Sequence, residues 1–279
     1  MTVINTNVAA NNTYRLMAMA GEEKASSMEK LSSGLRINRA ADDAAGLSIA
    51  EGLRSQSSGL EVAARNIGDA VSLAQTAEGG LASAGDILQR VRDLAVQAGN
   101  DTLNGEARTA IQTEVTQLAE ELGRMGNSIN FNGSSLMGAG GSSFSFQVGA
   151  NGGTDAATST DTISLTIATD LSVLSTTVGA LAFGDADAAS VSIEALDTAI
   201  TALSADRSNI GAVQNRLEHT LKHVNVTAEN LTNAESNIRD VDMAKEVVKQ
   251  SAANIKEQAA QAMLSQANQS TQGVLQLLR

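Results

Sequence analysis

Apolar residues recur every seven positions along extended stretches in both halves of this chain. In the N-terminal half the repeat contains Leu53, Leu60, Ile67, Ala74, Leu81, Leu88 and Ala95. In the C-terminal half it contains Ile210, Leu217, Val224, Leu231 and Ile238. A seven-residue apolar repeat is typical of helices that pack side by side along a continuous seam. Chain ends are commonly poorly ordered, so ends that carry the strongest pattern favour an assembly protein whose termini pair with each other and with other copies.

The composition also favours long helices. The 279 residues include no proline, which breaks helix interiors, and only 2% aromatic residues, so Ala, Leu, Ile and Val must form the core. Cysteine is absent, which excludes disulfides and thiolate metal sites. The net charge of −12 argues against nucleic acid and anionic membrane surfaces as partners. No stretch approaches the ~18 apolar residues of a membrane-spanning helix.

The repeats predict where the helices lie. We expect helix over most of residues 1–42, over about 45–99, and again over 111–129 after a turn at 98–106. A second row of small residues lies three positions after the first and completes the seam of the long helix. This second row contains Ala63, Ala70, Ala77, Ala84 and Val91.

The helical periodicity stops in the middle of the chain. Residues 144–148 and 163–167 alternate as strands do, with a Gly-rich segment between them. We predict a β-hairpin region over about 131–187, with disorder as the alternative for a segment of such low complexity. Helix is expected to resume near Ala188.

The C-terminal repeat changes face near residues 238–241. Large residues occupy one row up to Ile238, and beyond it they occupy the row three positions on. The new row contains Val241, Val248, Ile255 and Ala262. A changed face suggests a changed partner, so we predict a discontinuous terminal coiled-coil domain, 1–42 with 240–279, and a helical rod domain over 43–239. The expected fold is mainly α, a long antiparallel helical coiled-coil or bundle with a small β-hairpin region.

No pattern in the sequence supports catalysis. His219 and His223, the only histidines, are four residues apart on a predicted helix, a spacing that could hold zinc. The sequence marks no third ligand, so a partly solvated helix face is the simpler interpretation. The carboxylate pairs Asp42/Asp43 and Asp240/Asp242 lie near predicted helix ends, where capping explains them better than acid–base chemistry does.

A basic cluster follows the seam of the long N-terminal helix. Leu88 and Val91 belong to the seam, which leaves Arg90 and Leu94 on another face. We therefore expect both side chains to be exposed. The residues alone favour a solvated face over a binding patch, and both interpretations stay open.

Several long motifs resemble bacterial flagellins, in the same order as in that family and over nearly the whole chain. They are INTNVAANN near the start, LSSGLRINRAADDAAGLSIAEGLRSQ at 31–56, ILQRVRDLAVQAGNDT at 87–102, INFNG at 129–133, DRSNIGAVQNRLEHT at 206–220, NLTNAESNIRDVDMAKE at 230–246 and VLQLLR at the end.

The resemblance implies a structural subunit, without cofactor or enzymatic activity, that self-assembles into the hollow flagellar filament used for motility. The paired termini, disordered in the free monomer, would form the polymerisation helices of the inner tube, and no large outer domain is expected. The implied partners are other copies of the chain, the flagellar cap and hook-junction proteins, and an export chaperone. Secretion through the flagellar type III export apparatus would agree with an N-terminus that does not look like a cleaved secretory signal.

The resemblance also implies two surfaces that hosts recognise, both expected to serve first as subunit contacts. The vertebrate Toll-like flagellin receptor would contact Gln89, Arg90, Leu94 and Glu114. Cytosolic inflammasome sensors would read the tail residues Val274, Leu275, Leu277 and Leu278.

Two other structural classes and one enzymatic class remain as alternatives. A flagellar hook-filament junction protein shares flagellin-like termini. The signalling hairpin of a chemoreceptor also has heptads, but it predicts helix through residues 130–170. An enzyme would depend on the two histidines alone.

Overall fold

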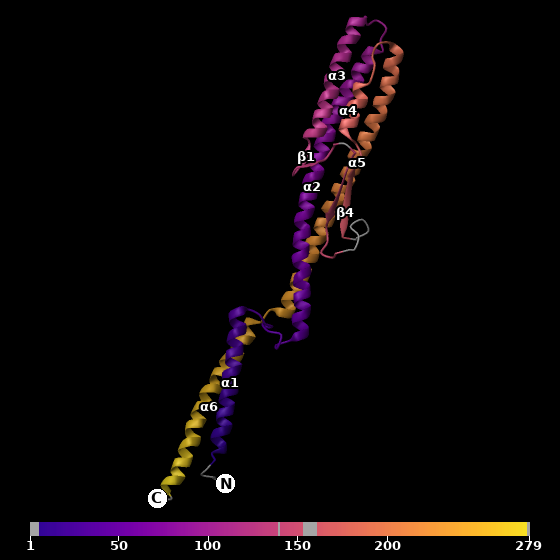
Figure 1. The fold of residues 1–279 in the computed structure, drawn as a ribbon. Helices are drawn as coiled ribbons and strands as arrows, with labels where there is room; N and C mark the ends of the chain where they lie inside the picture. The colour runs from indigo at the N-terminus through magenta and orange to yellow at the C-terminus, as the bar shows by residue number, and fades with distance from the viewer. Residues whose placement is uncertain (1–5, 139, 153–160, 278–279) are drawn as a thin grey trace. The chain divides into compact units, whose positions relative to one another are not determined.

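The computed structural model describes residues 6–138, 140–152 and 161–277, with side chains up to Ser270 in the last helix. The fold is mainly α with two small antiparallel sheets, as predicted (Figure 1). The helices are α1 (Val8–Ser33), α2 (Ala44–Ala98), α3 (Gly105–Ser128), α4 (Leu171–Gly179), α5 (Ala186–Arg239) and α6 (Met243–Leu277), and the strands are β1 (Asn130–Phe131), β2 (Ser134–Ser135), β3 (Ser142–Gln147) and β4 (Thr162–Ile167).

Contacts divide the chain into two compact units. The terminal unit runs up to Ser55 and resumes at Asn230, and the central unit comprises Gln56–Glu229. Helices α2 and α5 therefore contribute residues to both units. The central unit buries large aliphatic side chains, whereas most large apolar side chains of α1 and α6 in the terminal unit are exposed.

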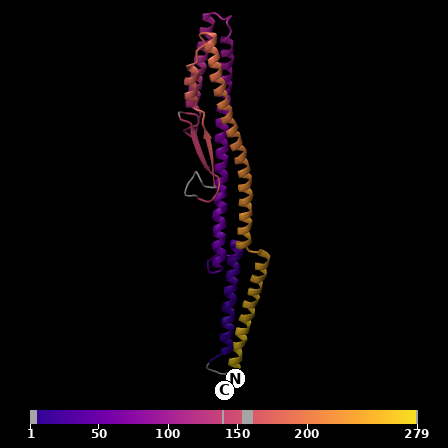
Figure 2. The ribbon, with the colours of Figure 1, turned by 90° about the vertical axis from the view of Figure 1, so that its right-hand side faces the viewer.

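The central unit is built on the seam that the seven-residue repeats predict. On α2, both predicted rows are buried from Leu60 to Ala95. Helix α5 lies alongside α2 (Figure 2) and contributes its own buried seven-residue row. That row contains Ala189, Leu196, Leu203, Ile210, Leu217 and Val224. The two helices touch closely where α2 has Gly85, since a Cβ there would lie 3.2 Å from Leu203 Cδ2.

Two short hairpins form the predicted β-region. Strands β1 and β2 are joined by Asn132 and Gly133, whose φ angles of 49° and 82° suit a tight two-residue loop. Strands β3 and β4 pair antiparallel, with Phe144 opposite Leu165. Residues 163, 165 and 167 of β4 are buried while their neighbours 164 and 166 are exposed. The alternating pattern read from the sequence is thus confirmed, and it rules out the continuous helix of a chemoreceptor hairpin.

Helix α4 was not predicted, because its segment lies inside the stretch 131–187 that we assigned to β-hairpins. Its sequence, LSVLSTTVG, is rich in Val, Thr and Ser, which have modest helix propensity. The signal that could have found it is Asp170, whose carboxylate accepts hydrogen bonds from the backbone N–H groups of Ser172 (2.8 Å) and Val173 (3.2 Å). Packing against α3 then holds the short helix, since a Cβ on Gly126 would lie 3.0 Å from Leu171 Cβ.

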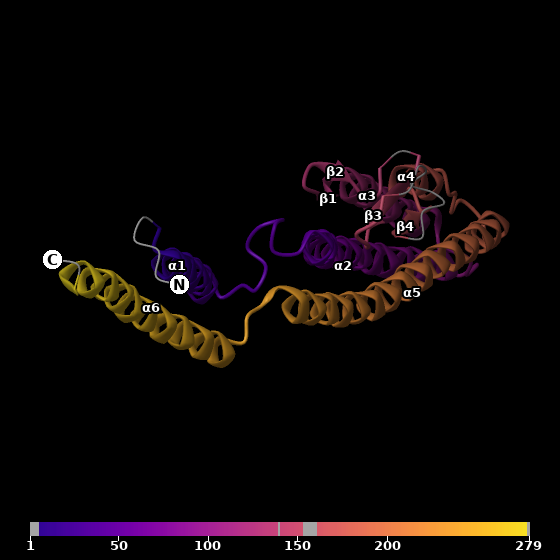
Figure 3. The same cartoon turned by 90° about the horizontal axis from the view of Figure 1, so that it is seen from below.

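In the terminal unit, α1 and α6 lie side by side (Figures 1 and 3). The connection from α5 to α6 pairs with the end of α1, because Val241 N donates to Gly34 O (3.0 Å) and Arg36 N donates to Arg239 O (2.6 Å). Gly34 ends α1 with a φ of 73°, a left-handed conformation that glycine adopts without steric cost. Helix α5 thus stops at the place where the apolar row changes face in the sequence.

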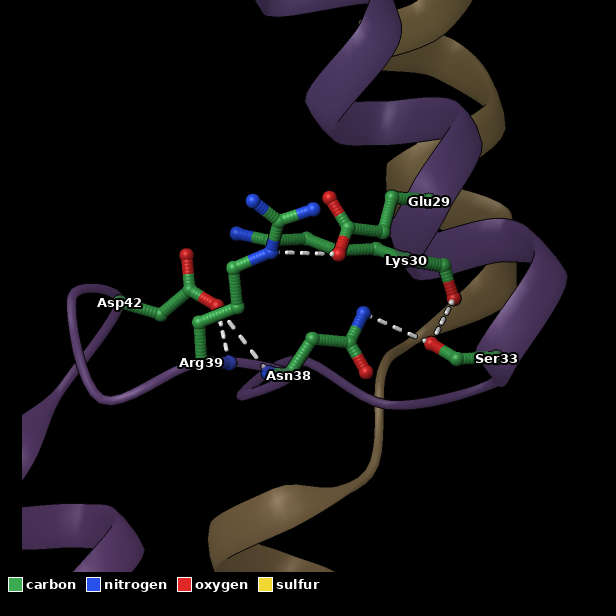
Figure 4. Close-up of polar contacts among 6 residues, drawn as sticks. All are labelled: Glu29, Lys30, Ser33, Asn38, Arg39 and Asp42. Atoms are coloured by element: carbon green, nitrogen blue, oxygen red, sulfur yellow. Dashed lines mark hydrogen bonds and ion pairs between the residues drawn. The ribbon is translucent and has the colours of Figure 1, made fainter.

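A compact polar loop joins α1 to α2 (Figure 4). The Asp42 carboxylate accepts from the backbone N–H groups of Asn38 and Arg39, both at 3.0 Å, and these bonds lower the pKa of Asp42. The Arg39 side chain forms an ion pair with Glu29 of α1 at 2.9 Å, and the Asn38 amide donates to the Ser33 hydroxyl at 2.8 Å. The loop is therefore fixed by its own side chains.

The capping predicted for the carboxylate pairs is confirmed for one residue of each pair. Asp43 accepts from Gly46 N (2.9 Å) at the start of α2, and Asp242 accepts from Lys245 N (3.2 Å) at the start of α6. Asp42 instead closes the loop before α2, and Asp240 accepts from the Ser236 hydroxyl (2.6 Å) in the last turn of α5. These carboxylates have structural partners.

Candidate self-association surface

Helices α1 and α6 meet along a seam of small and polar side chains. On α6, Glu246 and Ala253 are buried, and the partly buried residues are Gln250, Asn254, Glu257, Ala260, Leu264 and Ala267. On α1, Ala20 and Ser27 are buried, and the partly buried residues are Ala10, Thr13, Met17, Gly21, Lys24, Lys30 and Leu31. The most deeply buried positions of the seam are thus small or polar. Such a seam removes little apolar surface from water, so it contributes much less hydrophobic stabilisation than the α2–α5 seam does.

A buried hydrogen bond lies in this seam. The Ser27 hydroxyl donates to Glu246 Oε1 at 2.7 Å, and both residues are buried. This bond, helped by the ammonium of Lys249 at 3.0 Å, holds the pKa of Glu246 below its ordinary value against the opposing effect of burial. The bond fixes how α1 and α6 align, because sliding either helix would leave a carboxylate buried without its donor.

Ion pairs flank the seam on the surface. Lys24 of α1 pairs with Glu257 of α6 at 3.1 Å, and Lys256 of α6 pairs with Glu23 of α1 at 3.0 Å. Exposed pairs of this kind typically contribute only about 0–1 kcal/mol each. They therefore add to the alignment of the two helices more than to their stability.

Most of the large apolar side chains of this helix pair are exposed to solvent, although Met17, Leu31 and Leu264 are partly buried. Val248 and Ile255, from the row predicted to mediate polymerisation, are each 68% exposed. In that row Ala262 is also exposed and Val241 is partly buried. The same holds for Val8, Tyr14, Leu16, Met19, Met28, Met243, Val247 and Met263. Such a concentration of exposed apolar side chains marks an interaction surface.

An apolar groove of about 430 Å³ runs between the two helices on this surface. It is lined by Leu16, Met19, Met263, three alanines and Thr13. The Lys256–Glu23 ion pair lies at the groove as well. The groove is thus open, mostly apolar and built from both helices.

In the central unit, the predicted patch on α2 and α3 is brought together in part. Arg90 Nη2 and Nε donate to Glu114 Oε1 at 2.7 and 3.0 Å, and both side chains are about half exposed. Gln89 is also exposed. These three polar side chains form an accessible surface.

The prediction that Leu94 is exposed is wrong, because the side chain is only 3% exposed. Leu94 belongs to a third seven-residue row on α2 that the sequence analysis missed, with Leu73, Gly80 and Ile87. This row turns toward α3 and the segment after it, since a Cβ on Gly80 would lie 2.7 Å from Ile129 Cδ1. Helix α2 therefore buries two flanks instead of one.

The tail residues and the two histidines singled out in the sequence do not form a site in the described part of the chain. Val274, Leu275, Leu277 and Leu278 lie outside the residues whose side chains the structure describes. His219 and His223 are both exposed on α5, and no cluster of three metal-ligating side chains occurs within the described ranges. No described helix has the length and apolar character needed to cross a membrane.

Comparison with known proteins identifies the family. Residues 4–140 match the family model of the bacterial flagellin N-terminal helical region, and residues 193–278 match that of the bacterial flagellin C-terminal helical region. A flagellin of Halalkalibacterium halodurans is 47% identical over 278 residues, which cover 99% of this chain and 100% of that protein. This chain belongs to the flagellin family. A Bacillus subtilis flagellin is 44% identical, and the alignment covers 99% of each chain. The flagellar filament 33 kDa core protein of Treponema phagedenis is 42% identical, and that alignment covers 99% of this chain and 100% of the relative.

Membership of the flagellin family explains the two kinds of packing. Flagellins are structural proteins that self-assemble into the flagellar filament, so a flagellin monomer has to carry surfaces that other copies bury. These relatives have names of filament proteins and give no support to the hook-filament junction alternative. As in a compact flagellin, the chain passes from β4 through α4 to α5 without a large outer domain.

Proposed function

We propose that this flagellin polymerises through the outward face of α6 and of the residue Val241 before it, with Val241, Val248, Ile255 and Ala262 as the contact row. The carrying observation is that Val248 and Ile255 are 68% exposed, whereas the buried residues of α6, Glu246 and Ala253, are polar or small. Burying each of these side chains against another copy would contribute roughly 1.5–3 kcal/mol.

We further propose that the segments 1–42 and 240–279 act as the discontinuous assembly domain, with 43–239 as the rod domain. The connection between α5 and α6 supports this division, since a helix end and a change of exposed face coincide there. In this arrangement the rod domain folds by itself, and the assembly domain gains most of its stability from neighbouring copies.

The test replaces the two exposed aliphatic residues by carboxylates. V248D/I255D should raise the critical concentration for polymerisation at least about a hundredfold, because two apolar contacts are lost and two charges enter a buried row. The measurement is the protein left in the supernatant after sedimentation, with electron microscopy of the pellet.

A matched control is S251D/Q258D, which adds the same charge to α6 at the same seven-residue spacing, at positions that are already polar and exposed. It should polymerise at close to the wild-type concentration. Normal filaments from V248D/I255D, or equal loss in both variants, would place the contact row elsewhere.

The surface of Gln89, Arg90 and Glu114 is proposed as a subunit contact that the vertebrate Toll-like flagellin receptor also binds, with Leu94 supporting it from beneath. The support is the exposed Arg90–Glu114 pair. Arg90→Ala should weaken receptor binding by the monomer without changing its melting temperature. Leu94→Ala should lower that temperature as well, because it empties a buried position at a cost of roughly 2–5 kcal/mol. Unchanged binding by Arg90→Ala would refute the receptor role.

The other proposed partners follow from flagellin-family membership. They are the flagellar cap and hook-junction proteins, the export chaperone, and the flagellar type III export apparatus that would deliver the chain to the extracellular filament. The tail residues Val274, Leu275, Leu277 and Leu278 are proposed as the segment read by cytosolic sensors. We propose no enzymatic activity, since the exposed carboxylates near the helix ends serve as caps.

A further inference from the structure

Two methionines from different helices line the same groove of the terminal unit. Met19 of α1 is 53% exposed and Met263 of α6 is 60% exposed, and both border the apolar groove between these helices. The other groove residues are Leu16 and three alanines, together with Thr13 and the Lys256–Glu23 pair. Each methionine side chain is thus accessible to small solutes while lying within a mostly apolar surface.

We propose that Met19 and Met263 are a reversible oxidation site through which peroxide-class oxidants control self-association. In the reaction, a thioether sulfur attacks one oxygen of hydrogen peroxide, the O–O bond breaks, and the sulfur becomes a sulfoxide while water leaves. The sulfur loses the two electrons that the peroxide gains, so atoms and electrons balance. Methionine sulfoxide reductases restore the thioether.

The consequence for assembly follows from the change in polarity. A thioether is apolar and adaptable, whereas a sulfoxide is polar, with an oxygen that requires a hydrogen-bond donor. The two donors that line the groove are already engaged, since the Thr13 hydroxyl donates to the backbone carbonyls of Ala9 and Ala10 and the Lys256 ammonium pairs with Glu23, and the remaining lining side chains have no donor. Burying the oxidised groove against another copy would leave the sulfoxide oxygen unsatisfied, so oxidation should disfavour the polymer. This part of the proposal rests on the proposed function, because it requires that other copies cover the groove.

The chain contains internal controls for site selectivity. Met125 and Met137 of the central unit are 9% and 0% exposed, so peroxide should reach them much more slowly. Met28 and Met243 are 50% and 48% exposed and belong to the same unit but do not line the groove, so replacing them separates an effect of the groove from an effect of exposed methionines in general.

The experiment treats the full-length monomer with hydrogen peroxide and follows each methionine by peptide mass spectrometry. Met19 and Met263 should be oxidised well before Met125 and Met137. The treated wild type should then require roughly tenfold more protein to polymerise, and a methionine sulfoxide reductase should reverse the loss.

Two variants assign the effect to the groove. M19L/M263L keeps side-chain volume but has no sulfur in the groove. Its critical concentration, compared with that of the same variant untreated, should therefore not rise after peroxide. M28L/M243L retains the groove methionines and should stay as sensitive as the wild type. Equal sensitivity of M19L/M263L and wild type, or oxidation of Met125 and Met137 at the same rate as the groove pair, would overturn the proposal. Failure of the untreated wild type to polymerise would contradict the proposed function instead, and the oxidation rates of the monomer would still decide whether the groove pair is the preferred site.

Discussion

Glu246 is the only ionisable side chain buried in the part of the chain that the structure describes, at 4% exposed. Its carboxylate accepts a hydrogen bond from the Ser27 hydroxyl across the α1–α6 seam and pairs with Lys249 on its own helix. The positive charge of Lys30 on α1 also favours the ionised carboxylate. A buried polar pair adds little net stability, but removing one partner is costly. At the scale of single residues, this pair therefore specifies one alignment of two helices between which no other buried hydrogen bond joins two side chains among the described residues.

The pH dependence of the pair follows from its lowered pKa. Because the folded-state pKa of Glu246 lies below the ordinary 4.5, its stabilising effect is fully present above that value and is lost as the pH falls below it. Glu246→Gln should therefore depolymerise at a lower temperature than the wild type near neutral pH. The difference should shrink below about pH 4.5. Thermal depolymerisation of both proteins across this range measures it, and a difference that does not change with pH would contradict the role of the ionised carboxylate.

At the scale of elements, the quality of each prediction depended on how much apolar surface the element buries. Helices α2 and α5 were predicted correctly, because Leu, Ile and Val that recur every seven residues form a continuous apolar stripe, and such a stripe is buried against another helix. The α1–α6 seam was not seen, since Ala253 and Ala260 are too small to mark a face. The large side chains of Val248 and Ile255 instead marked the face of α6 that is exposed in the structure.

Two further errors have a physical origin in tertiary context. Leu94 was expected to be exposed because the seven-residue repeat marks only one buried face of α2. Helix α3 packs against a second flank of α2, and Leu94 is buried there. Helix α4 was missed because its propensity is weak and its stability comes from Asp170 and from α3, a contact that no local pattern announces.

The α2–α5 seam should dominate the stability of the central unit. Leu217 is fully buried in the α5 row, so Leu217→Ala should lower the free energy of unfolding by roughly 2–5 kcal/mol. Val226 on the same helix is 56% exposed, and Val226→Ala should change it by less than about 0.5 kcal/mol. Urea denaturation of the monomer tests both, and equal effects would show that the seam is not the core.

At the scale of the whole molecule, this flagellin combines a unit with an apolar core and a unit whose apolar residues face outward. A helix pair with a small, polar seam gains little from folding alone, and ordering it costs roughly 1–2 kcal/mol per residue in backbone entropy. Neighbouring copies that cover the exposed residues would offset that cost. Assembly and folding of the terminal unit are then one process.

Removing residues 240–279 should separate the two units' roles. The truncated chain should stay monomeric at concentrations where the full chain forms filaments, since it lacks the proposed contact row. The thermal unfolding of its central unit should be nearly unchanged, because that unit's seam lies within 56–229. Analytical ultracentrifugation and circular dichroism provide these measurements, and filaments from the truncated protein would refute the assembly role of α6.

Amide hydrogen exchange of the full-length protein, compared between monomer and polymer, shows whether the terminal unit becomes stably ordered only on assembly. Amides of α1 and α6 should exchange rapidly in the monomer and become strongly protected in the polymer. Amides in the central part of α2 and α5 should be protected in both states. Equal, strong protection of α1 and α6 in monomer and polymer would contradict this prediction, because the terminal unit would then be stable without its neighbours.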